Sequence, residues 1–225
     1  MGLSHSPRIV TNGLVLALDA ANVKSYPGSG NTWTDMSGNG NNGTLTNGPT
    51  YSANNGGIIN YSGDAKVSTP LTLGATFTQS VWFRLTAVNT GQYQAIFGVY
   101  IGISSNYMCM LMNNNNAQMG IWAESLNGDA FGSGDVTVNT FYNYVLVREG
   151  HSITNGYKLY VNGNLTGSRN TGIRPSPDPV YVGGRPDISG QILVGGISLA
   201  QVYNRALSAA EVQQNFNALR GRYGI

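Results

Sequence analysis

The sequence has few charged residues: Asp, Glu, Lys and Arg together make up 10% of its 225 residues, where an average globular chain carries about 25%. The 12 Lys and Arg and the 10 Asp and Glu leave a net charge of +2, and no short window is basic enough to follow a phosphate backbone. We therefore expect no nucleic-acid partner. Neutral amides and hydroxyls dominate the polar positions instead, a composition common in proteins displayed outside cells.

Cysteine, histidine and long apolar runs are also scarce. Cys109 is the single cysteine, which excludes an intramolecular disulfide, and two histidines are too few for a zinc site of the usual type. No stretch approaches the roughly 18 apolar residues of a membrane span, and the N-terminus lacks the apolar segment of a secretory signal. We therefore expect no membrane span and no signal peptide, and synthesis in a cytosol.

Glycine and asparagine are abundant, and they mark turns. The chain has 31 Gly, and Asn-Gly pairs recur along it between short alternating segments rich in β-branched and aromatic residues. This pattern predicts antiparallel strands joined by hairpins. The clearest hairpin joins 157–161 to 164–168 through Asn162 and Gly163, which suit the two positive-φ positions of a type I′ turn. The other predicted strands are 14–18, 57–61, 76–85, 94–103, 107–112, 118–123, 142–148, 180–183 and 188–203, the last of them divided.

About ten strands are too many for one open sheet without curling. We therefore expect an all-β fold of two antiparallel sheets packed as a sandwich. The segment 28–60, which has few apolar residues, and the four asparagines of 113–116 are predicted as loops, and neither has a linker composition that divides domains. The prediction is a single domain over 13–225, preceded by an N-terminal arm over 1–12.

One helix closes the chain. Ser208 and Glu211 have the spacing of a reciprocal capping box, and Val212, Phe216 and Leu219 form an apolar stripe at i, i+4 and i+7. We expect this stripe to dock on the sandwich and the opposite side, rich in Gln and Asn, to face water.

Four motifs stand in the same order along the chain as in a known family. They are 14–22 (LVLALDAAN), 32–45 (TWTDMSGNGNNGTL), 157–163 (YKLYVNG), and 202–208 (VYNRALS) followed by Glu211. With them, nearly the whole chain resembles the laminin-G-like branch of the concanavalin A-like jelly-roll superfamily. The resemblance implies two antiparallel sheets packed as a jelly roll, in agreement with the strand pattern. It does not decide the function, because this fold hosts lectins, glycoside hydrolases, adhesion domains and passive structural parts.

Glycoside hydrolysis requires two carboxyl groups roughly 5 to 10 Å apart. The three glutamates, Glu124, Glu149 and Glu211, are far apart in the sequence, and the Glu-x-Asp-x-x-Glu cluster of jelly-roll glucanases is absent. Asp129 and Asp135, which flank a predicted loop over residues 131–134, are the acids that would pair with Glu124, but solvated loop carboxylates are more common than catalytic ones. We therefore expect no enzymatic activity and no catalytic residues.

Calcium is the one ion that the resemblance brings into question, because laminin-G-like domains often hold it with loop carboxylates and backbone carbonyls. Asp19 and Asp35 match positions at which the family carries acids, whereas Ser198 stands where many relatives have Asp. We expect no cofactor, and a structural calcium ion at Asp19 and Asp35 is the alternative. Without an ion, both aspartates would form turns by bonding nearby backbone N–H groups.

Glycan binding would use exposed aromatic rings, which stack on sugar faces, together with amides that bond sugar hydroxyls. The candidates are Trp122, Tyr93, Tyr107, Asn113 and Asn114. For each of these aromatic residues, packing in the core is the alternative role. Trp33 and Trp82 are expected in the core, Trp82 because it alternates with apolar residues within a predicted strand.

The segment 6–14 (SPRIVTNGL) also resembles proteins encoded by tailed bacteriophages, in which such domains occur as virion components. A fold and surface suited to display outside cells, together with the lack of an export signal, favour a virion protein that is made in the host cytoplasm and released by lysis. We therefore predict a non-enzymatic structural protein of a phage particle, such as a capsid decoration, a tail fibre or a tail-surface protein.

Such a protein would be present in many copies or as a homo-oligomer. Its partners would be other virion proteins, docked through residues 1–12, and a host surface glycan. A stand-alone carbohydrate-binding module is the alternative function, and a glycoside hydrolase is the weaker alternative.

Overall fold

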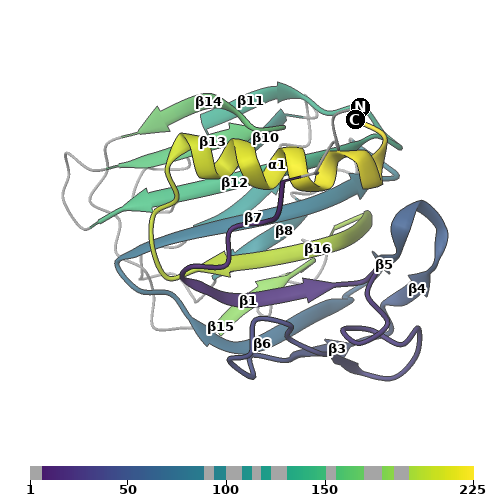
Figure 1. Cartoon of the computed structure of the whole chain (residues 1–225). Helices are drawn as coiled ribbons and strands as arrows, with labels where there is room; N and C mark the ends of the chain where they lie inside the picture. Colours follow the sequence, from purple (N-terminus) through teal and green to yellow (C-terminus); the bar gives the residue numbers. More distant parts are fainter. Residues whose placement is uncertain are drawn as a thin grey trace, which may run out of the picture.

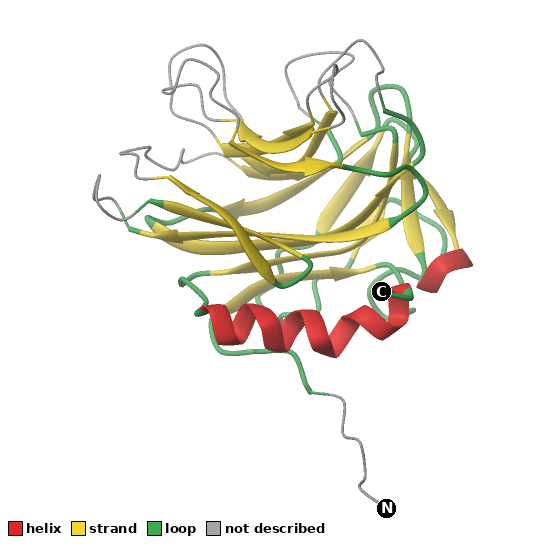
Figure 2. Cartoon of the chain, turned by 90° about the horizontal axis from the view of Figure 1, so that it is seen from above, coloured by secondary structure: helices red, strands yellow, loops and turns green. Residues whose placement is uncertain are grey.

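The computed structural model describes residues 7–88, 94–99, 108–112, 118–122, 131–150, 156–169, 179–184 and 193–225. Two eight-stranded antiparallel sheets pack face to face, and helix α1 (Ala209–Tyr223) lies on the outer face of one of them (Figure 1, Figure 2). We call the sheet under the helix sheet A and the other one sheet B. The predicted all-β jelly-roll sandwich with a C-terminal helix is confirmed. Within the described ranges, no helix is long and apolar enough to cross a membrane.

Sheet A joins the first strand of the chain to the last. Its strands are β1 (Leu14–Asp19), β4 (Thr50–Ser52), β5 (Ile58–Tyr61), β7 (Thr76–Leu85), β12 (Phe141–Glu149), β13 (Tyr157–Val161), β14 (Asn164–Arg169) and β16 (Gly195–Tyr203). Their order is β14-β13-β12-β7-β16-β5-β4, and β1 also pairs with β16. The short 3-10 helix η1 (Asn54–Gly56) precedes β5.

Sheet B is formed by strands from residues 32–135 and by one later strand. Its members are β2 (Thr32–Trp33), β3 (Gly43–Thr46), β6 (Lys66–Thr72), β8 (Gln94–Val99), β9 (Met108–Met112), β10 (Gln118–Trp122), β11 (Phe131–Asp135) and β15 (Pro179–Val182). Their order is β11-β10-β9-β8-β15-β6-β3-β2. The late strand β15 therefore lies between β8 and β6.

Most of the predicted strands are present. The 157–168 hairpin is confirmed, and Asn162 and Gly163 at its tip have φ angles of 49° and 79°. β7 has the predicted bounds. The described part of the strand predicted over 188–203 is the single strand β16, with a register shift between Ile197 and Leu199 in place of a division.

The loop prediction for 28–60 is wrong, because this segment supplies β2, β3 and β4, whereas β5 confirms the strand predicted over 57–61. The predicted loop over 131–134 is likewise the strand β11, and β6 is a further strand that the pattern did not indicate. These strands are short or rich in glycine and polar residues, so their local pattern is weak, and β3 exists because it pairs with β6. The predicted loop 113–116 lies outside the described residues.

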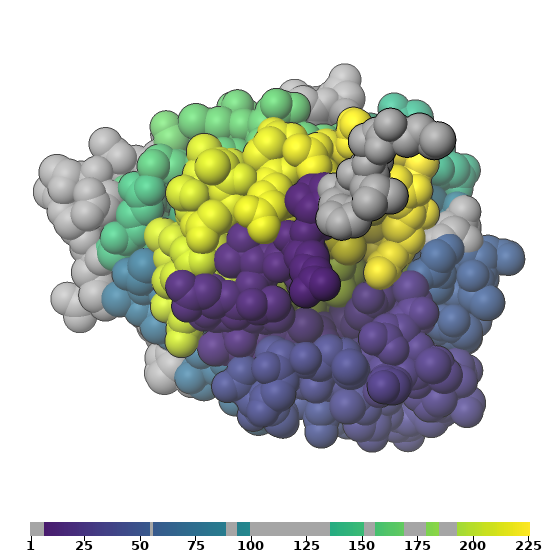
Figure 3. Space-filling view, viewed as in Figure 1, coloured from purple at the N-terminus to yellow at the C-terminus, as the bar shows by residue number. Residues whose placement is uncertain are grey.

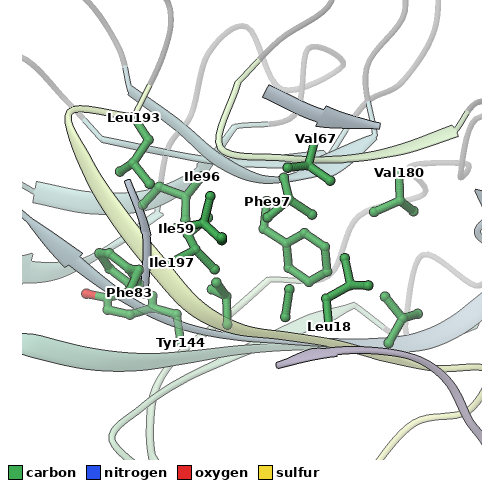
Figure 4. Packing of buried hydrophobic residues seen from close by; sticks show 14 of the residues in the cluster. Leu18, Ile59, Val67, Phe83, Ile96, Phe97, Tyr144, Val180, Leu193 and Ile197 are labelled. Carbon is green, nitrogen blue, oxygen red and sulfur yellow. The ribbon is translucent and has the colours of Figure 1, made fainter. Parts of the chain in front are cut away.

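The space between the two sheets is filled by apolar side chains. Leu18 and Ile59 come from sheet A and meet Phe97 and Val180 from sheet B (Figure 4). Trp33 is fully buried in the same cluster, as predicted. Fully burying a Val, Leu, Ile or Phe side chain contributes about 1.5 to 3 kcal/mol to folding. The many such side chains in this layer therefore supply most of the stabilisation of the sandwich.

A second apolar layer lies between sheet A and α1. Trp82, predicted to be a core residue, is buried here, with ring centroids 5.7 Å from Phe216 and 4.2 Å from Tyr223. Val212 and Leu219 are buried on the same side of the helix, which confirms the predicted apolar stripe. The helix therefore covers a face of the sheet that is itself hydrophobic.

The predicted capping box holds the start of α1. Ser208 Oγ accepts a hydrogen bond from the Glu211 backbone N–H, and the Glu211 carboxylate accepts one from the Ser208 backbone N–H. Arg205 donates two bonds to this carboxylate, at 2.5 and 3.0 Å, and lowers the pKa of Glu211 to about 2. The stabilisation that this shift provides is complete above the ordinary pKa of glutamate and is lost as the pH falls toward about 2.

Residues 8–12 of the predicted N-terminal arm lie against α1 and β16 (Figure 3). The Val10 backbone N–H donates to Asn215 Oδ1 at 2.7 Å, and the Tyr203 hydroxyl donates to the Val10 carbonyl at 2.9 Å. The Gln214 side-chain amide donates to the Arg8 carbonyl at 2.7 Å. The chain therefore enters the domain along the outer side of sheet A.

Gly195 is required by the close approach of β16 to β7, because a Cβ at this position would lie 2.2 Å from the Arg84 carbonyl oxygen. We predict that Gly195→Ala lowers the free energy of unfolding by at least about 2 kcal/mol, since backbone must shift to accept the methyl group. Gly221→Ala in α1 is the matched control: its Cβ would meet nothing within 4 Å, and alanine favours a helix by about 0.5 to 1 kcal/mol. Denaturant unfolding measures both changes, and a Gly195→Ala protein as stable as the parent would contradict the register of β7 and β16.

Candidate functional site

An open pocket of about 500 Å³ lies on the outer face of sheet B, beside β3, β6 and β15. Its walls are formed by Gly40, Asn42, Thr44, Ser68, Thr69, Pro70, Pro179 and Tyr181. The volume falls within the range of small-molecule sites, roughly 300 to 1,000 Å³. None of the lining residues carries a charge.

Strand register brings the central residues of this pocket together. Thr44 on β3 pairs with Ser68 on β6, and Ser68 pairs in turn with Tyr181 on β15. Their neighbours Leu45, Val67 and Val182 are buried in the core between the sheets (Val67 is labelled in Figure 4). Because successive residues of a strand point to opposite faces, Thr44, Ser68 and Tyr181 form a row on the outer face.

The pocket offers neutral hydrogen-bonding groups that have no partner within the part of the chain that the structure describes. Asn42 uses its Oδ1 to accept the backbone N–H of Asp35 at 2.9 Å, which turns its amide N–H groups to other partners. The hydroxyls of Thr44, Ser68 and Tyr181 have no hydrogen-bond partner among the described residues. Together with the Tyr181 ring, these groups are suited to a polar ligand that also has an apolar face.

Two further groups shape the walls. Thr69 donates its hydroxyl to the Val180 carbonyl at 3.0 Å, which ties β6 to β15 and leaves its oxygen lone pairs as acceptors. Pro70 and Pro179 are exposed and apolar. The described lining therefore combines hydroxyls and an amide with three ring side chains, and none of these residues is an acid or a base.

The glycan-binding residues expected from the sequence stay predictions. Tyr93, Tyr107, Asn113 and Asn114 lie outside the described residues. Trp122 is the last residue of β10, and its predicted role stays a prediction. Its cross-strand partner is Cys109 on β9. Cys109 pairs with Gly98 on β8, and Gly98 pairs with Tyr181 on β15. The backbone register therefore connects the end of β10 to the row that forms the pocket.

Tyr181 and Ser68 were missed as site residues because each is a single polar or aromatic position within a strand. A signal for Tyr181 was present in the sequence: Val180-Tyr181-Val182 alternates, so the tyrosine takes the face opposite to the two valines. No local signal places Ser68 beside it, because that neighbourhood depends on the pairing of β6 with β15.

The described acids hold the chain together. Asp19 pairs with Arg222 at 2.9 Å, and Glu149 pairs with Lys158 at 2.5 Å. In the ranges that the structure describes, no three His, Cys, Asp or Glu residues gather in a way that suits a metal ion. Of the acids weighed for catalysis, Glu124 and Asp129 lie outside these ranges, and Asp135 ends β11.

The two aspartates expected as calcium ligands are occupied by other partners. Asp35 Oδ1 accepts the N–H groups of Ala17 and Ser37 at 2.8 and 2.9 Å, and its Oδ2 accepts the Ser37 hydroxyl and the Asn41 N–H at 2.7 and 3.0 Å. Asp19 Oδ1 accepts the Ala21 N–H at 3.0 Å, beside the Arg222 guanidinium.

Ser198, which stands where many relatives have Asp, is fully buried. Its hydroxyl oxygen accepts a hydrogen bond from the Tyr223 hydroxyl at 3.0 Å. Calcium requires several free oxygens and repels a neighbouring cation, so the arrangement of Asp19, Asp35 and Ser198 does not fit it. The turn-forming role given as the alternative for both aspartates agrees with their hydrogen bonds.

A family profile matches most of the chain. It is Laminin_G_3, described as the concanavalin A-like lectin/glucanases superfamily, and it matches residues 60–213. This region includes Ser68 and Tyr181 of the pocket. No curated protein matches the sequence.

Solved structures share this fold at low sequence identity. Trypanosoma rangeli sialidase superposes with a TM-score of 0.74 and 17% identity, and the match covers 97% of this chain and 36% of the sialidase. Domain 4 of AbnA, a GH43 extracellular arabinanase from Geobacillus stearothermophilus solved in complex with arabinotriose, gives a TM-score of 0.69 and 15% identity over 90% of this chain and 97% of that domain. The chain thus spans little more than a third of the sialidase but nearly the whole arabinanase domain.

We predict that calcium does not stabilise this protein, because the oxygens of Asp19 and Asp35 already hold N–H, O–H and guanidinium donors. The midpoint of thermal unfolding should be the same in chelator and in millimolar calcium, whereas an ion bound by the folded state alone would raise it. A calcium-dependent rise that Asp19→Asn removes would contradict this assignment.

Proposed function

Because the chain belongs to the concanavalin A-like lectin/glucanase superfamily, we propose that it binds carbohydrate without cleaving it, through the pocket at Tyr181, and that it does so as a component of a phage particle. The observation that carries the binding proposal is the row Thr44, Ser68 and Tyr181, whose hydroxyls have no partner among the described residues. A sugar would supply hydrogen-bond partners for this row, because its hydroxyls both donate and accept. Its C–H face would also pack against the tyrosine ring.

The relatives in structure support a carbohydrate ligand. The arabinanase domain that matches almost end to end was solved with arabinotriose bound. At 15% identity the likeness concerns the fold, so the argument for this chain rests on its own pocket.

The described lining of the pocket supports binding without cleavage. Glycoside hydrolysis uses an acid and a base or nucleophile roughly 5 to 10 Å apart, in most families a pair of carboxyl groups. The eight described lining residues include no Asp, Glu or His, and Tyr181 is the only ionisable group among them. These residues would hold a sugar by neutral hydrogen bonds and ring contact.

We predict that Tyr181→Ala lowers the affinity for a bound glycan at least about tenfold, because the ring contact is lost. Tyr181→Phe keeps the ring and should retain most of the affinity. The control is Leu165→Ala, which truncates an exposed side chain on β14 of sheet A and should change nothing. A glycan array identifies a ligand. Calorimetry then measures its affinity for the parent protein, for these three variants and for Ser68→Ala.

Binding that survives both Tyr181→Ala and Ser68→Ala would place the site elsewhere, and the predicted set around Trp122 would then be the next to test. Loss of binding in Leu165→Ala would show that the assay reports general instability.

The particle role draws on the sequence and on the placement of the arm. The segment 6–14 resembles phage-encoded proteins, and residues 8–12 run along the outer side of sheet A. The pocket lies on the outer face of sheet B. Figure 2 shows that sheet B packs on the side of sheet A opposite to α1. A domain attached through residues 1–12 would therefore present the pocket away from its attachment.

For this role we predict that purified phage particles from the source sample contain this chain in many copies. Quantitative mass spectrometry of the particles, with imaging of the same fraction, measures the copy number. Intact particles that lack its peptides would contradict the virion role and leave a stand-alone carbohydrate-binding module.

A further inference from the structure

The charge around the pocket distinguishes between classes of sugar. Acidic sugars, such as sialic or uronic acids, carry a carboxylate, which proteins bind most often with the paired N–H groups of arginine or with a lysine ammonium. The eight described residues that line the pocket are neutral, so they offer neither group.

Three described cations form ion pairs on other parts of the sandwich. Lys158, Arg205 and Arg222 hold carboxylates, and all three belong to sheet A, to α1 or to the segment between them. Lys66 stands on β6 two residues before Ser68 and so shares the outer face with it, but it is not among the residues that line the pocket.

The balance of donors and acceptors points the same way. The hydroxyls of Thr44, Ser68 and Tyr181 both donate and accept, Asn42 offers amide N–H groups, and Thr69 has only its lone pairs to offer. A carboxylate only accepts hydrogen bonds, so it would use the donors of the pocket and leave its acceptors to other groups. Sugar hydroxyls satisfy both kinds of group.

Resting on the proposed function, we infer that the ligand of this pocket is an uncharged oligosaccharide and that acidic sugars are bound no better than their neutral counterparts. This separates the chain from the sialidase that it resembles in fold, structures of which were solved with sialic acid.

The experiment compares pairs of oligosaccharides that differ only by a sialic or uronic acid. We expect the neutral member to bind at least as tightly as the acidic one, with an affinity that changes less than about twofold between low and high salt, because exposed charge pairs are what salt screens. Lys66→Gln should leave the affinity unchanged, and Tyr181→Ala should lower it at least about tenfold.

Ser68→Arg supplies the missing cation in the centre of the row and should shift the preference toward the acidic member, which shows that the pocket can report on charge. Tighter binding of the acidic member by the parent protein, or a loss of binding in Lys66→Gln, would overturn the inference and leave carbohydrate binding in place. No binding of any member, by a protein shown to be folded, would overturn the proposed function and the inference together.

Discussion

The burial of β7 on both of its faces is the constraint on which the rest of the structure depends. One face packs Phe77, Val81 and Phe83 into the core between the sheets, and the other carries Trp82. A strand that is buried on both faces needs two covers, and Trp82 left in water would forgo its hydrophobic stabilisation. Sheet B is one cover and α1 is the other. Because α1 ends the chain and residues 8–12 run beside it, both ends of the described chain close this second layer (Figure 3).

Sheet B meets a different condition along β3, β6 and β15. Their inner positions are filled by residues such as Leu45, Val67 and Val182, so the alternation of a strand turns the residues between them outward. The outward positions that line the pocket are hydroxyls and a tyrosine. The ligand site that we propose therefore lies on the sheet that α1 does not cover.

The described acids explain why binding without chemistry is the function that we propose. Asp19 ties the end of β1 to α1 through Arg222, and Glu211 joins the helix cap to Arg205. Asp35 holds the turn before β3 by accepting the Asn41 N–H. The Asp35 backbone N–H donates to Asn42, and this bond fixes the Asn42 side chain in the wall of the pocket. Of these three acids, Asp35 acts on the pocket, through Asn42, and none of them lines it. What remains in the pocket is neutral hydrogen bonding and ring contact.

Some elements are determined by the sequence alone because their signals are local. The 157–168 hairpin rests on Asn162 and Gly163, α1 rests on its capping box and stripe, and these together with the alternating strands determined the fold class. Tertiary structure alone decided β2, β3 and β4, whose few polar residues form strands only beside their partners. The pocket belongs to this second group. Alternation tells which residues of one strand share a face, but it does not tell which strands lie side by side, and the row from Thr44 to Tyr181 exists only through that pairing.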